Sequence, residues 1–416
     1  MNEPPLVPYS FPIIGHTKEY FTNTESFLTT CRKQYGEIFS LYVFGEIITI
    51  IGKEHSFEIT KNHNDFNFFE AFRETLPTDS LLRRPITFNI NLIKLVNDRF
   101  SSTGRYITYM NKIQDALKIS IDKYIGECIG QKYIKSLDNV ASQLVARNIV
   151  SIVLGEKFSY DDEIVNTFAN LTTEITGLVH FPPILNFIHK SLHRSLLIFR
   201  LKYASNVYPK HRNLLFNKLS LIIKQREHEK KELGDTSADI LQMFIDFSTK
   251  DDIVDLQELT DYIVEFIFIS VQATSNALRY TLYEYGSHPE YWKELLEENE
   301  MISNIVKDGY FDLKDIDKMV KLDSFIKETL RYWMPCGKDH NIAKLGLQHK
   351  TISDYFTFSN GYQVPKGRNV YLYVSNIHET DQIGSTFNGF RYVGKNSPAT
   401  RLGDDFVPFG RGRHAC

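Results

Sequence analysis

One stretch of the chain constrains its fold more than any other: LTDYIVEFIFISVQATSNALRYTLYEYGSHPEYW. Its periodicity predicts a long helix over 256–285, and Gly286 followed by Pro289 marks where that helix stops. From Ile263 to Ile269 the helix is apolar nearly all round, so it belongs in a protein interior. Other helices must therefore surround it.

The remaining periodicities supply those helices and a little β structure. Further helices are predicted over 54–63, 107–131, 137–154, 162–178, 206–231, 236–247, 289–296 and 318–333. Apolar runs on both sides of Gly45 predict a β-hairpin over 38–51, and RNVYLYV (368–374) predicts a strand. The expected fold is mainly α with a small β region (α+β), assembled from both chain ends in a single domain, 1–416.

Composition excludes several classes of protein. The 416 residues carry a net charge of −3, which argues against a nucleic-acid-binding surface. No segment reaches the roughly 20 consecutive apolar residues that a membrane span needs, and MNEPPLVPYSFPIIG has no signal-peptide pattern. We expect the chain as given to be soluble or peripheral. Three of its four scattered cysteines, Cys31, Cys128 and Cys336, are expected to be buried thiols in a reducing compartment.

The fourth cysteine ends a distinctive loop, FGRGRHAC. A thiolate binds a metal where its charge is stabilised. Gly410 and Gly412 let the backbone fold tightly around the sulfur of Cys416, while His414 adds a donor group and Phe409 offers a ring to a flat cofactor. A single cysteine in such a loop suits haem iron better than zinc, which takes three or four protein ligands. The alternative is an ordinary cysteine in a glycine-rich surface loop.

Two further features are weak when taken alone. In KLDSFIKETLRYW, Glu328 and Arg331 lie three residues apart on one helix face and can pair, although an exposed i,i+3 salt bridge is the alternative. In the long helix, QATSN forms a polar notch. We expect Thr274 there to be buried, with its hydroxyl either bonded to a carbonyl one turn earlier or facing a bound ligand.

Together these motifs resemble the cytochrome P-450 family of haem-thiolate monooxygenases. FGRGRHAC, the Glu328–Arg331 pair, the buried helix with Thr274, and FNGFRY stand in the family's order. NGYQVPKGRNV resembles the family's GxxIPKGxxV, and PPLVPYSFPIIGH resembles the segment after its membrane anchor. The resemblance therefore covers essentially the whole chain. The form GRHAC is similar to the fungal style of the loop, which implies a eukaryotic, fungal source.

The resemblance implies a role for each residue of the cysteine loop. Cys416 would be the axial thiolate on the iron of haem b, and it would be the metal ligand. Phe409 would pack near that thiolate, and His414 would contact a haem propionate. Gly410 and Gly412 would shape the cofactor-binding loop.

The resemblance also implies roles outside that loop. Glu328, Arg331 and Arg391, the last from FNGFRY, would form a buried network that holds the cysteine loop in place. Thr274 would be catalytic, beside the oxygen-binding face. The chain would be a fragment that stops at the haem ligand and lacks both the C-terminal tail and the N-terminal membrane anchor.

Two departures from the family leave alternatives open. Val271 stands where the family has a glycine, and Ala273 stands where it has an acid. Both put ordinary dioxygen activation and proton delivery in question. One alternative is a haem-thiolate hydroperoxide isomerase or dehydratase that needs no reductase. Another is a non-catalytic or degenerate haem-binding protein.

The expected function is that of a monooxygenase. It would hydroxylate or epoxidise an apolar small-molecule substrate (a lipid, a sterol or another secondary metabolite) with dioxygen and with electrons from NADPH through a reductase. The stretch 177–199, with Lys190 and Arg194, would suit contact with a membrane surface, although a plain amphipathic helix pair is the alternative. The implied location is the cytosolic face of the endoplasmic reticulum membrane, with no nucleic-acid partner.

Overall fold

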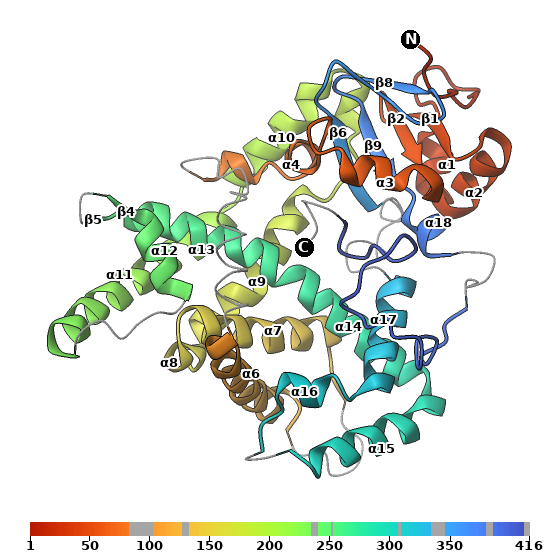
Figure 1. Ribbon diagram of the computed structural model, residues 1–416. Coiled ribbons are helices and arrows are strands. Elements are labelled where there is room, and N and C mark those ends of the chain that lie inside the picture. Colours follow the sequence, from red (N-terminus) through yellow and green to blue (C-terminus); the bar gives the residue numbers. More distant parts are fainter. Residues whose placement is uncertain are drawn as a thin grey trace.

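The long apolar helix lies at the centre of the protein, as its composition requires. A computed structural model describes residues 1–82, 103–126, 133–233, 240–250, 253–306, 309–333, 346–379 and 386–411. In it the predicted helix is two helices, α13 (Leu256–Ser270) and α14 (Gln272–Ser287), which meet at Val271. They run through the middle of the molecule, and α7 (Leu137–Val153) and α9 (Asp162–Val179) lie against them (Figure 1).

The break at Val271 has a local cause. The hydroxyl of Ser270 donates to the carbonyl of Phe266 at 2.6 Å, and the hydroxyl of Ser275 donates to the carbonyl of Val271 at 2.7 Å. Serine hydroxyls that bond back one turn compete with the backbone for these carbonyls and bend helices. The single helix predicted over 256–285 was therefore wrong at this point, where two such serines flank the break.

Other helices enclose this pair. Those of the described residues are α1 (Thr17–Thr22), α2 (Thr24–Tyr35), α3 (Lys53–Lys61), α4 (Phe68–Thr75), α6 (Thr103–Tyr124), α8 (Glu156–Ser159), α10 (Lys190–Lys202), α11 (Val207–Leu233), α12 (Ile240–Ser248), α15 (Trp292–Ser303), α16 (Leu313–Ile316), α17 (Val320–Trp333) and α18 (Val374–His378), with short 3-10 turns η1 (Thr78–Ser80), η2 (Ile184–Phe187) and η3 (Pro289–Tyr291). Helices α1, α2, α4, α8, α16 and α18 were not predicted, and α10 was expected only within the amphipathic pair left open over 177–199. Among the described helices, none is both long and apolar enough to cross a bilayer.

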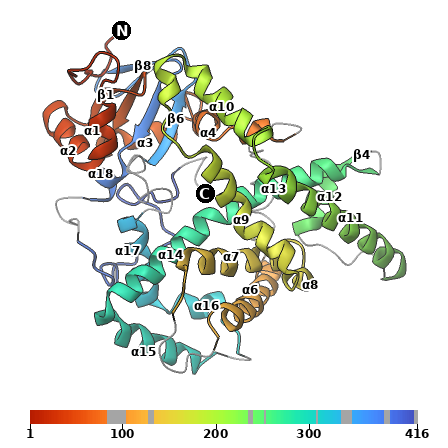
Figure 2. The same ribbon diagram turned by 180° about the vertical axis from the view of Figure 1, so that it is seen from behind.

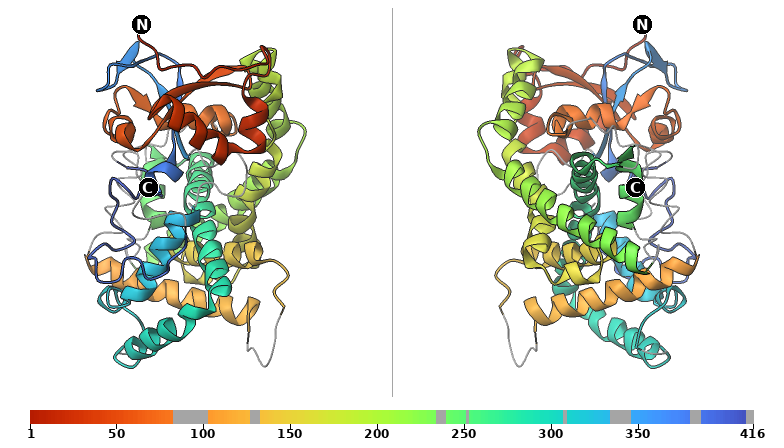
Figure 3. Two further views of the ribbon diagram at one scale, coloured as in Figure 1. Left: turned by 90° about the vertical axis from the view of Figure 1, so that its right-hand side faces the viewer. Right: turned by 90° about the vertical axis from the view of Figure 1, so that its left-hand side faces the viewer.

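A sheet at one end of the molecule joins distant parts of the chain, as the sequence predicted (Figures 2 and 3). Its order is β1-β2-β9-β6-β3, with strands β1 (Ile38–Val43), β2 (Glu46–Ile51), β9 (Asn369–Leu372), β6 (Gly346–Thr351) and β3 (Phe66–Asn67). Two small pairs, β4 (Thr249–Lys250) with β5 (Ile253–Val254) and β7 (Tyr355–Thr357) with β8 (Gln363–Pro365), form separate two-stranded sheets. The predicted hairpin is confirmed, with Ile38 opposite Ile51. The strand predicted over 368–374 ends earlier, because Val374 begins α18.

The hairpin turn requires a glycine. Gly45 has a φ of +78°, and a Cβ there would lie 2.7 Å from the carbonyl oxygen of Asn186. The turn therefore packs directly on η2. The ring of Phe44 lies 6.0 Å from the ring of Phe187, which extends the same contact. This packing sets the position of η2 against the sheet.

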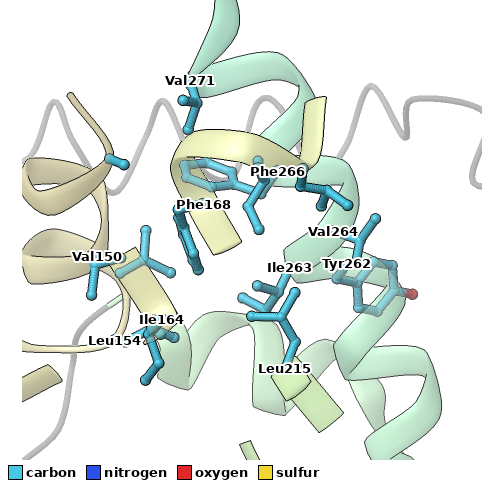
Figure 4. Close-up of a cluster of buried hydrophobic side chains, with 14 of the residues drawn as sticks. Val150, Leu154, Ile164, Phe168, Leu215, Tyr262, Ile263, Val264, Phe266 and Val271 are labelled. Atoms are coloured by element: carbon cyan, nitrogen blue, oxygen red, sulfur yellow. The ribbon is translucent and has the colours of Figure 1, made fainter. Parts of the chain in front are cut away.

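The largest hydrophobic core surrounds α13. Phe168 of α9 and Ile263 of α13 are both fully buried in it (Figure 4). Cys31 is buried as expected, and burial raises the pKa of its thiol to about 11. Cys128 and Cys336 lie outside the described residues.

Replacing Phe168 by alanine tests this core. Because the ring is fully buried, Phe168→Ala is expected to lower the free energy of unfolding by about 3–5 kcal/mol, through lost burial and the cavity left behind. Denaturant titration followed by circular dichroism measures the loss. Phe199→Ala on α10 is the control, since its side chain is 55% exposed. Equal losses in the two variants would contradict this assignment of the core.

Candidate functional site

A buried carboxylate organises the region before the cysteine loop. Glu328 of α17 is fully buried. Arg331, one turn later, donates to both of its oxygens at 2.8 Å, from Nε to Oε2 and from Nη2 to Oε1. Arg391, far along the chain, donates from Nε to Oε2 at 3.0 Å. Such charge-assisted, bidentate bonds are the strong class of hydrogen bond. The pair is therefore not the exposed salt bridge left open by the sequence.

Backbone groups supply the remaining hydrogen bonds of Glu328 and its two arginines. The N–H of Asn388 donates to Oε1 of Glu328 at 2.9 Å. Both arginines also donate to the carbonyl of Thr386, Arg331 at 3.2 Å and Arg391 at 2.7 Å. Burial alone would lower the pKa of Arg331, but its bonds to Glu328 outweigh this and raise the pKa. The structure thus brings together the three residues that the sequence grouped.

Lys327 is a second anchor, which the sequence analysis did not identify. Its side chain is buried, and Nζ donates to the carbonyls of Ser397 and Pro398 at 3.1 Å and to the Ser397 hydroxyl at 2.8 Å. The ammonium also lies over the rings of Tyr392 and Phe406, at 4.7 and 4.5 Å. Burial lowers its pKa. Lysine is rarely buried, so nothing in the sequence distinguished it from a surface residue.

His378 connects α17 to the start of the cysteine loop. The N–H of Val407 donates to Nε2 of His378 at 2.9 Å, so Nδ1 carries the ring proton and bonds the carbonyl of Arg331 at 3.2 Å. The imidazole stacks on the ring of Phe406 at 5.7 Å. No sequence motif pointed to this histidine. The segment 386–411 is therefore fixed to both α17 and α18 (Figure 1).

The described part of the cysteine loop has the conformation that its glycine allows. Gly410 is buried with a φ of +77°, and its N–H donates to the carbonyl of Val407 at 3.2 Å. A side chain at that φ would be strained, so this tight turn needs glycine. Phe409 is half-buried beside it. Gly412, His414 and Cys416 lie outside the described residues.

Thr274 is exposed, which contradicts the expectation that it is buried. Its hydroxyl makes no hydrogen bond within the described part of the chain, whereas the hydroxyls of Ser270 and Ser275 bond back to the helix. The expected polar notch is therefore real, but Ser275 is the buried hydroxyl in it. The neighbouring Phe268 and Ile269 are partly exposed too. The central helix is thus uncovered near its break.

These features fit the cofactor that the resemblance implies. Haem is a flat and largely apolar group, and its iron takes a cysteine thiolate in one class of haem proteins. The partly exposed Phe268 and Ile269, which precede Thr274 on the central helix, suit such a group. The turn at Gly410 follows Val407, whose N–H is held by His378, and such a fixed turn suits a loop that presents a thiolate without fraying. The residues that would hold the cofactor, Gly412, His414 and Cys416, follow this turn in the sequence.

A substitution at Glu328 tests whether the network stabilises the fold. Glu328→Gln removes the charge but keeps the shape, which leaves Arg331 and Arg391 without their counter-ion. The free energy of unfolding is expected to fall by about 3–5 kcal/mol, the cost of breaking a buried pair from one side.

Denaturant titration measures that change, and haem content per protein gives a second readout. The matched control is Glu294→Gln, since Glu294 pairs with Lys321 of the same helix α17 at 2.6 Å on the protein surface. Exposed pairs contribute little. If both variants behave like the unmodified protein, the network has no structural role.

Comparison with known proteins agrees with this geometry. The sequence model of the cytochrome P-450 family matches residues 4–416. The chain is similar to the lanosterol 14-alpha demethylase of Cunninghamella elegans, 24% identical over 100% of this chain and 81% of that protein. It is also similar to the cytochrome P-450 monooxygenase ltmQ of Epichloe festucae var. lolii, 27% identical over 67% of this chain and 50% of that protein. Both relatives are fungal.

A solved structure shows the same fold. It is the retinoic acid bound cyanobacterial CYP120A1, which matches with a TM-score of 0.67 and 19% identity over 100% of this chain and 88% of that one. At that identity the likeness concerns the fold alone. The match of the family model over nearly the whole length carries the assignment further: the chain belongs to the cytochrome P-450 family of haem monooxygenases.

Proposed function

We propose that the protein inserts one oxygen atom into a C–H or C=C bond of an apolar small molecule, using haem b and electrons from NADPH through a reductase. The observation that carries this proposal is Thr274, whose exposed hydroxyl lies just after the break between α13 and α14, where Phe268 and Ile269 are also partly exposed. The relatives named lanosterol 14-alpha demethylase support an apolar substrate of the sterol or lipid class.

The cysteine loop would hold the cofactor. Cys416 supplies the thiolate ligand, Phe409 packs beside it, His414 contacts a propionate, and Gly410 and Gly412 allow the tight loop. When bound, thiolate-ligated haem supplies the activation of dioxygen. The work of the protein is to keep that loop rigid. The Glu328 network and Lys327 do so from the helix α17, through the segment that leads into the loop.

Thr274 would move a proton toward dioxygen as it is reduced. Its hydroxyl is free within the described part of the chain, so it can both accept and donate. The residue before it is Ala273, and Gln272 accepts a bond from the hydroxyl of Thr173 at 3.0 Å. Neither neighbour offers a carboxylate. Thr274 would therefore take its proton from water.

The lack of a carboxylate at Ala273 and Gln272, beside Thr274, favours a second candidate function. A haem-thiolate isomerase or dehydratase rearranges a hydroperoxide without any reductase and needs no carboxylate to deliver protons. Ala273 in the acid position is compatible with that chemistry. Turnover assays with and without reductase separate the two functions.

One apolar surface suits contact with a membrane. Ile184 and Ile188 in and after η2 are 60% and 74% exposed, and Phe199 of α10 is 55% exposed. The structure has the turn η2 and one helix here, so the amphipathic helix pair left open by the sequence was wrong. The cations Lys190 and Arg200 on the same helix suit anionic headgroups. We propose that this surface meets the cytosolic face of the endoplasmic reticulum membrane.

The ligand assignment is testable by spectroscopy. In the haem-loaded protein, the ferrous carbon monoxide complex is expected to show the red-shifted Soret band of thiolate ligation. Cys416→Ser is expected to abolish that band, because a hydroxyl does not replace the thiolate as an electron donor. Cys31→Ser is the control, since Cys31 is a buried thiol of α2. Persistence of the band in Cys416→Ser would show that another residue binds the iron.

The role of Thr274 is testable by measuring coupling. Thr274→Ala is expected to leave NADPH consumption in place while more hydrogen peroxide and less product form, because proton delivery fails before the oxygen–oxygen bond breaks. Turnover driven by added peroxide should change much less. The control is Thr281→Ala on the same helix, whose hydroxyl already donates to the carbonyl of Ala277 at 2.8 Å.

Unchanged coupling in Thr274→Ala would remove this residue from the mechanism. If the unmodified protein also converts lipid hydroperoxides without a reductase, the isomerase function replaces the monooxygenase one.

A further inference from the structure

The chain holds two tryptophans, and a buried carboxylate serves one of them. The indole N–H of Trp333, at the end of α17, donates to Oε1 of Glu284 on α14. Glu284 is 3% exposed, so its carboxylate lies inside the protein. The N–H of Trp292 donates instead to the backbone carbonyl of Tyr285 at 2.6 Å. A hydrogen bond to an ionised acceptor belongs to the stronger, charge-assisted class. The two indoles therefore differ in their chemistry.

Glu284 is held between this indole and a histidine. Nε2 of His288, which follows α14, lies 3.1 Å from Oε2 of Glu284. The other ring nitrogen of His288 lies 2.8 Å from Oε1 of Glu290 at the protein surface, and this bond lowers the pKa of Glu290. The carboxylate of Glu284 is thus fixed beside the indole nitrogen. It can take the indole proton and return it to the same nitrogen without moving.

Three tyrosines of the described residues surround the ring of Trp333, at the place where α14 lies beside α17 (Figure 1). Tyr280 stacks on the indole, with ring centroids 4.8 Å apart and ring planes 7° apart. Tyr283 lies edge-on to it at 5.6 Å, and Tyr332 lies edge-on at 5.8 Å. Indole and phenol are the aromatic side chains that give up an electron most readily. An electron can therefore pass between rings that are in contact here.

Charge and exposure distinguish Tyr283 from the other two tyrosines. The guanidinium of Arg279 lies 4.4 Å from the centre of the Tyr280 ring, and its positive charge opposes the loss of an electron from that ring. Tyr332 is half-buried and leads to Phe387 at 5.9 Å, whose ring resists oxidation. Tyr283 is 53% exposed, so a soluble donor can reach its ring.

We propose that Trp333 and Tyr283 form an electron relay. Trp333 gives an electron to an oxidant, and Tyr283 replaces that electron from a soluble donor at the surface. The oxidant is a one-electron oxidant derived from hydrogen peroxide, which forms whenever dioxygen is reduced without oxidising a substrate. The donor is a one-electron reductant of the ascorbate class. The relay protects the protein from oxidative damage, and it does not depend on which substrate the protein oxidises.

Each step of the relay balances in electrons and protons. The oxidant takes one electron from the indole, and the N–H proton of Trp333 passes to Glu284, which leaves a neutral indolyl radical. Tyr283 then gives one electron to the indolyl ring and its phenolic proton to water, while the proton on Glu284 returns to the indole nitrogen. The soluble donor and water finally supply one electron and one proton to the phenoxyl radical of Tyr283.

Pulse radiolysis tests this path. The full chain carrying Trp292→Phe keeps Trp333 as its one indole, and azidyl radicals oxidise it. We expect the indolyl absorbance to decay as the phenoxyl absorbance rises, at a rate that does not depend on protein concentration. Adding Tyr283→Phe is expected to slow the decay about 10-fold, which corresponds to a barrier higher by about 1.4 kcal/mol. Adding Tyr332→Phe is the control, since that ring contacts the same indole, and it should leave the decay unchanged.

The same measurement tests the proton acceptor. Glu284→Gln keeps the shape of the side chain and still accepts the indole N–H, but an amide does not take up the proton. The decay is expected to slow about 10-fold, because the proton must then return from water. Circular dichroism checks that the variant is folded. Glu290→Gln is the control, since Glu290 contacts His288 on the side away from Glu284 and should not alter the decay.

Exposure of the haem-loaded protein to hydrogen peroxide tests the protective role. Peptide mass spectrometry follows the oxidation of Trp333, which ascorbate is expected to suppress in the unmodified protein but not in Tyr283→Phe. The relay is wrong if Tyr283→Phe leaves the indolyl decay unchanged, or if Tyr332→Phe slows it equally. It is also wrong if ascorbate protects Trp333 equally with and without the Tyr283 hydroxyl. An unchanged decay in Glu284→Gln would remove the carboxylate from the path.

Discussion

The segment 386–411, which leads into the cysteine loop, depends on the carboxylate of Glu328. Two arginines and one backbone N–H surround it, and Arg391 with Asn388 brings in a segment some sixty residues further along the chain. Burying three charges is costly unless every one is paired. The arrangement meets that condition, because both arginines also share the carbonyl of Thr386. Glu328 thus fixes the segment around Asn388 and Arg391 to the helix α17.

The sequence predicted the parts of the structure that have a period or a motif. The central helix, the hairpin around Gly45 and the grouping of Glu328 with Arg331 were within reach, because apolar spacing and i,i+3 geometry are local properties. The roles of Lys327 and His378 could not be predicted, since they depend on carbonyls and amides that the fold brings close. The family resemblance added Arg391, which no local pattern would have linked to Glu328.

The central helix itself shows why its detail escaped prediction. Its composition indicates burial, yet within one turn it carries Asp261, paired with Arg212, and Glu265, whose Oε2 atom has no hydrogen-bond partner within the part of the chain that the structure describes. Both look alike in the sequence. Whether a buried acid is neutralised depends on which neighbouring helix presents a cation, which is a tertiary property. The exposure of Thr274 is also a tertiary property, because it depends on which neighbouring segments cover that part of the helix.

The sheet has a consequence for the order in which the protein can fold during synthesis. Strand β2 pairs in parallel with β9, and Arg368 donates to Thr49, which lies 319 positions earlier. The N-terminal hairpin must therefore wait, with its β2 edge open, until residues 369–372 have left the ribosome. Such late, non-local pairing slows folding and exposes a strand edge to aggregation. This chain would then depend on chaperones more than a helical protein of its size.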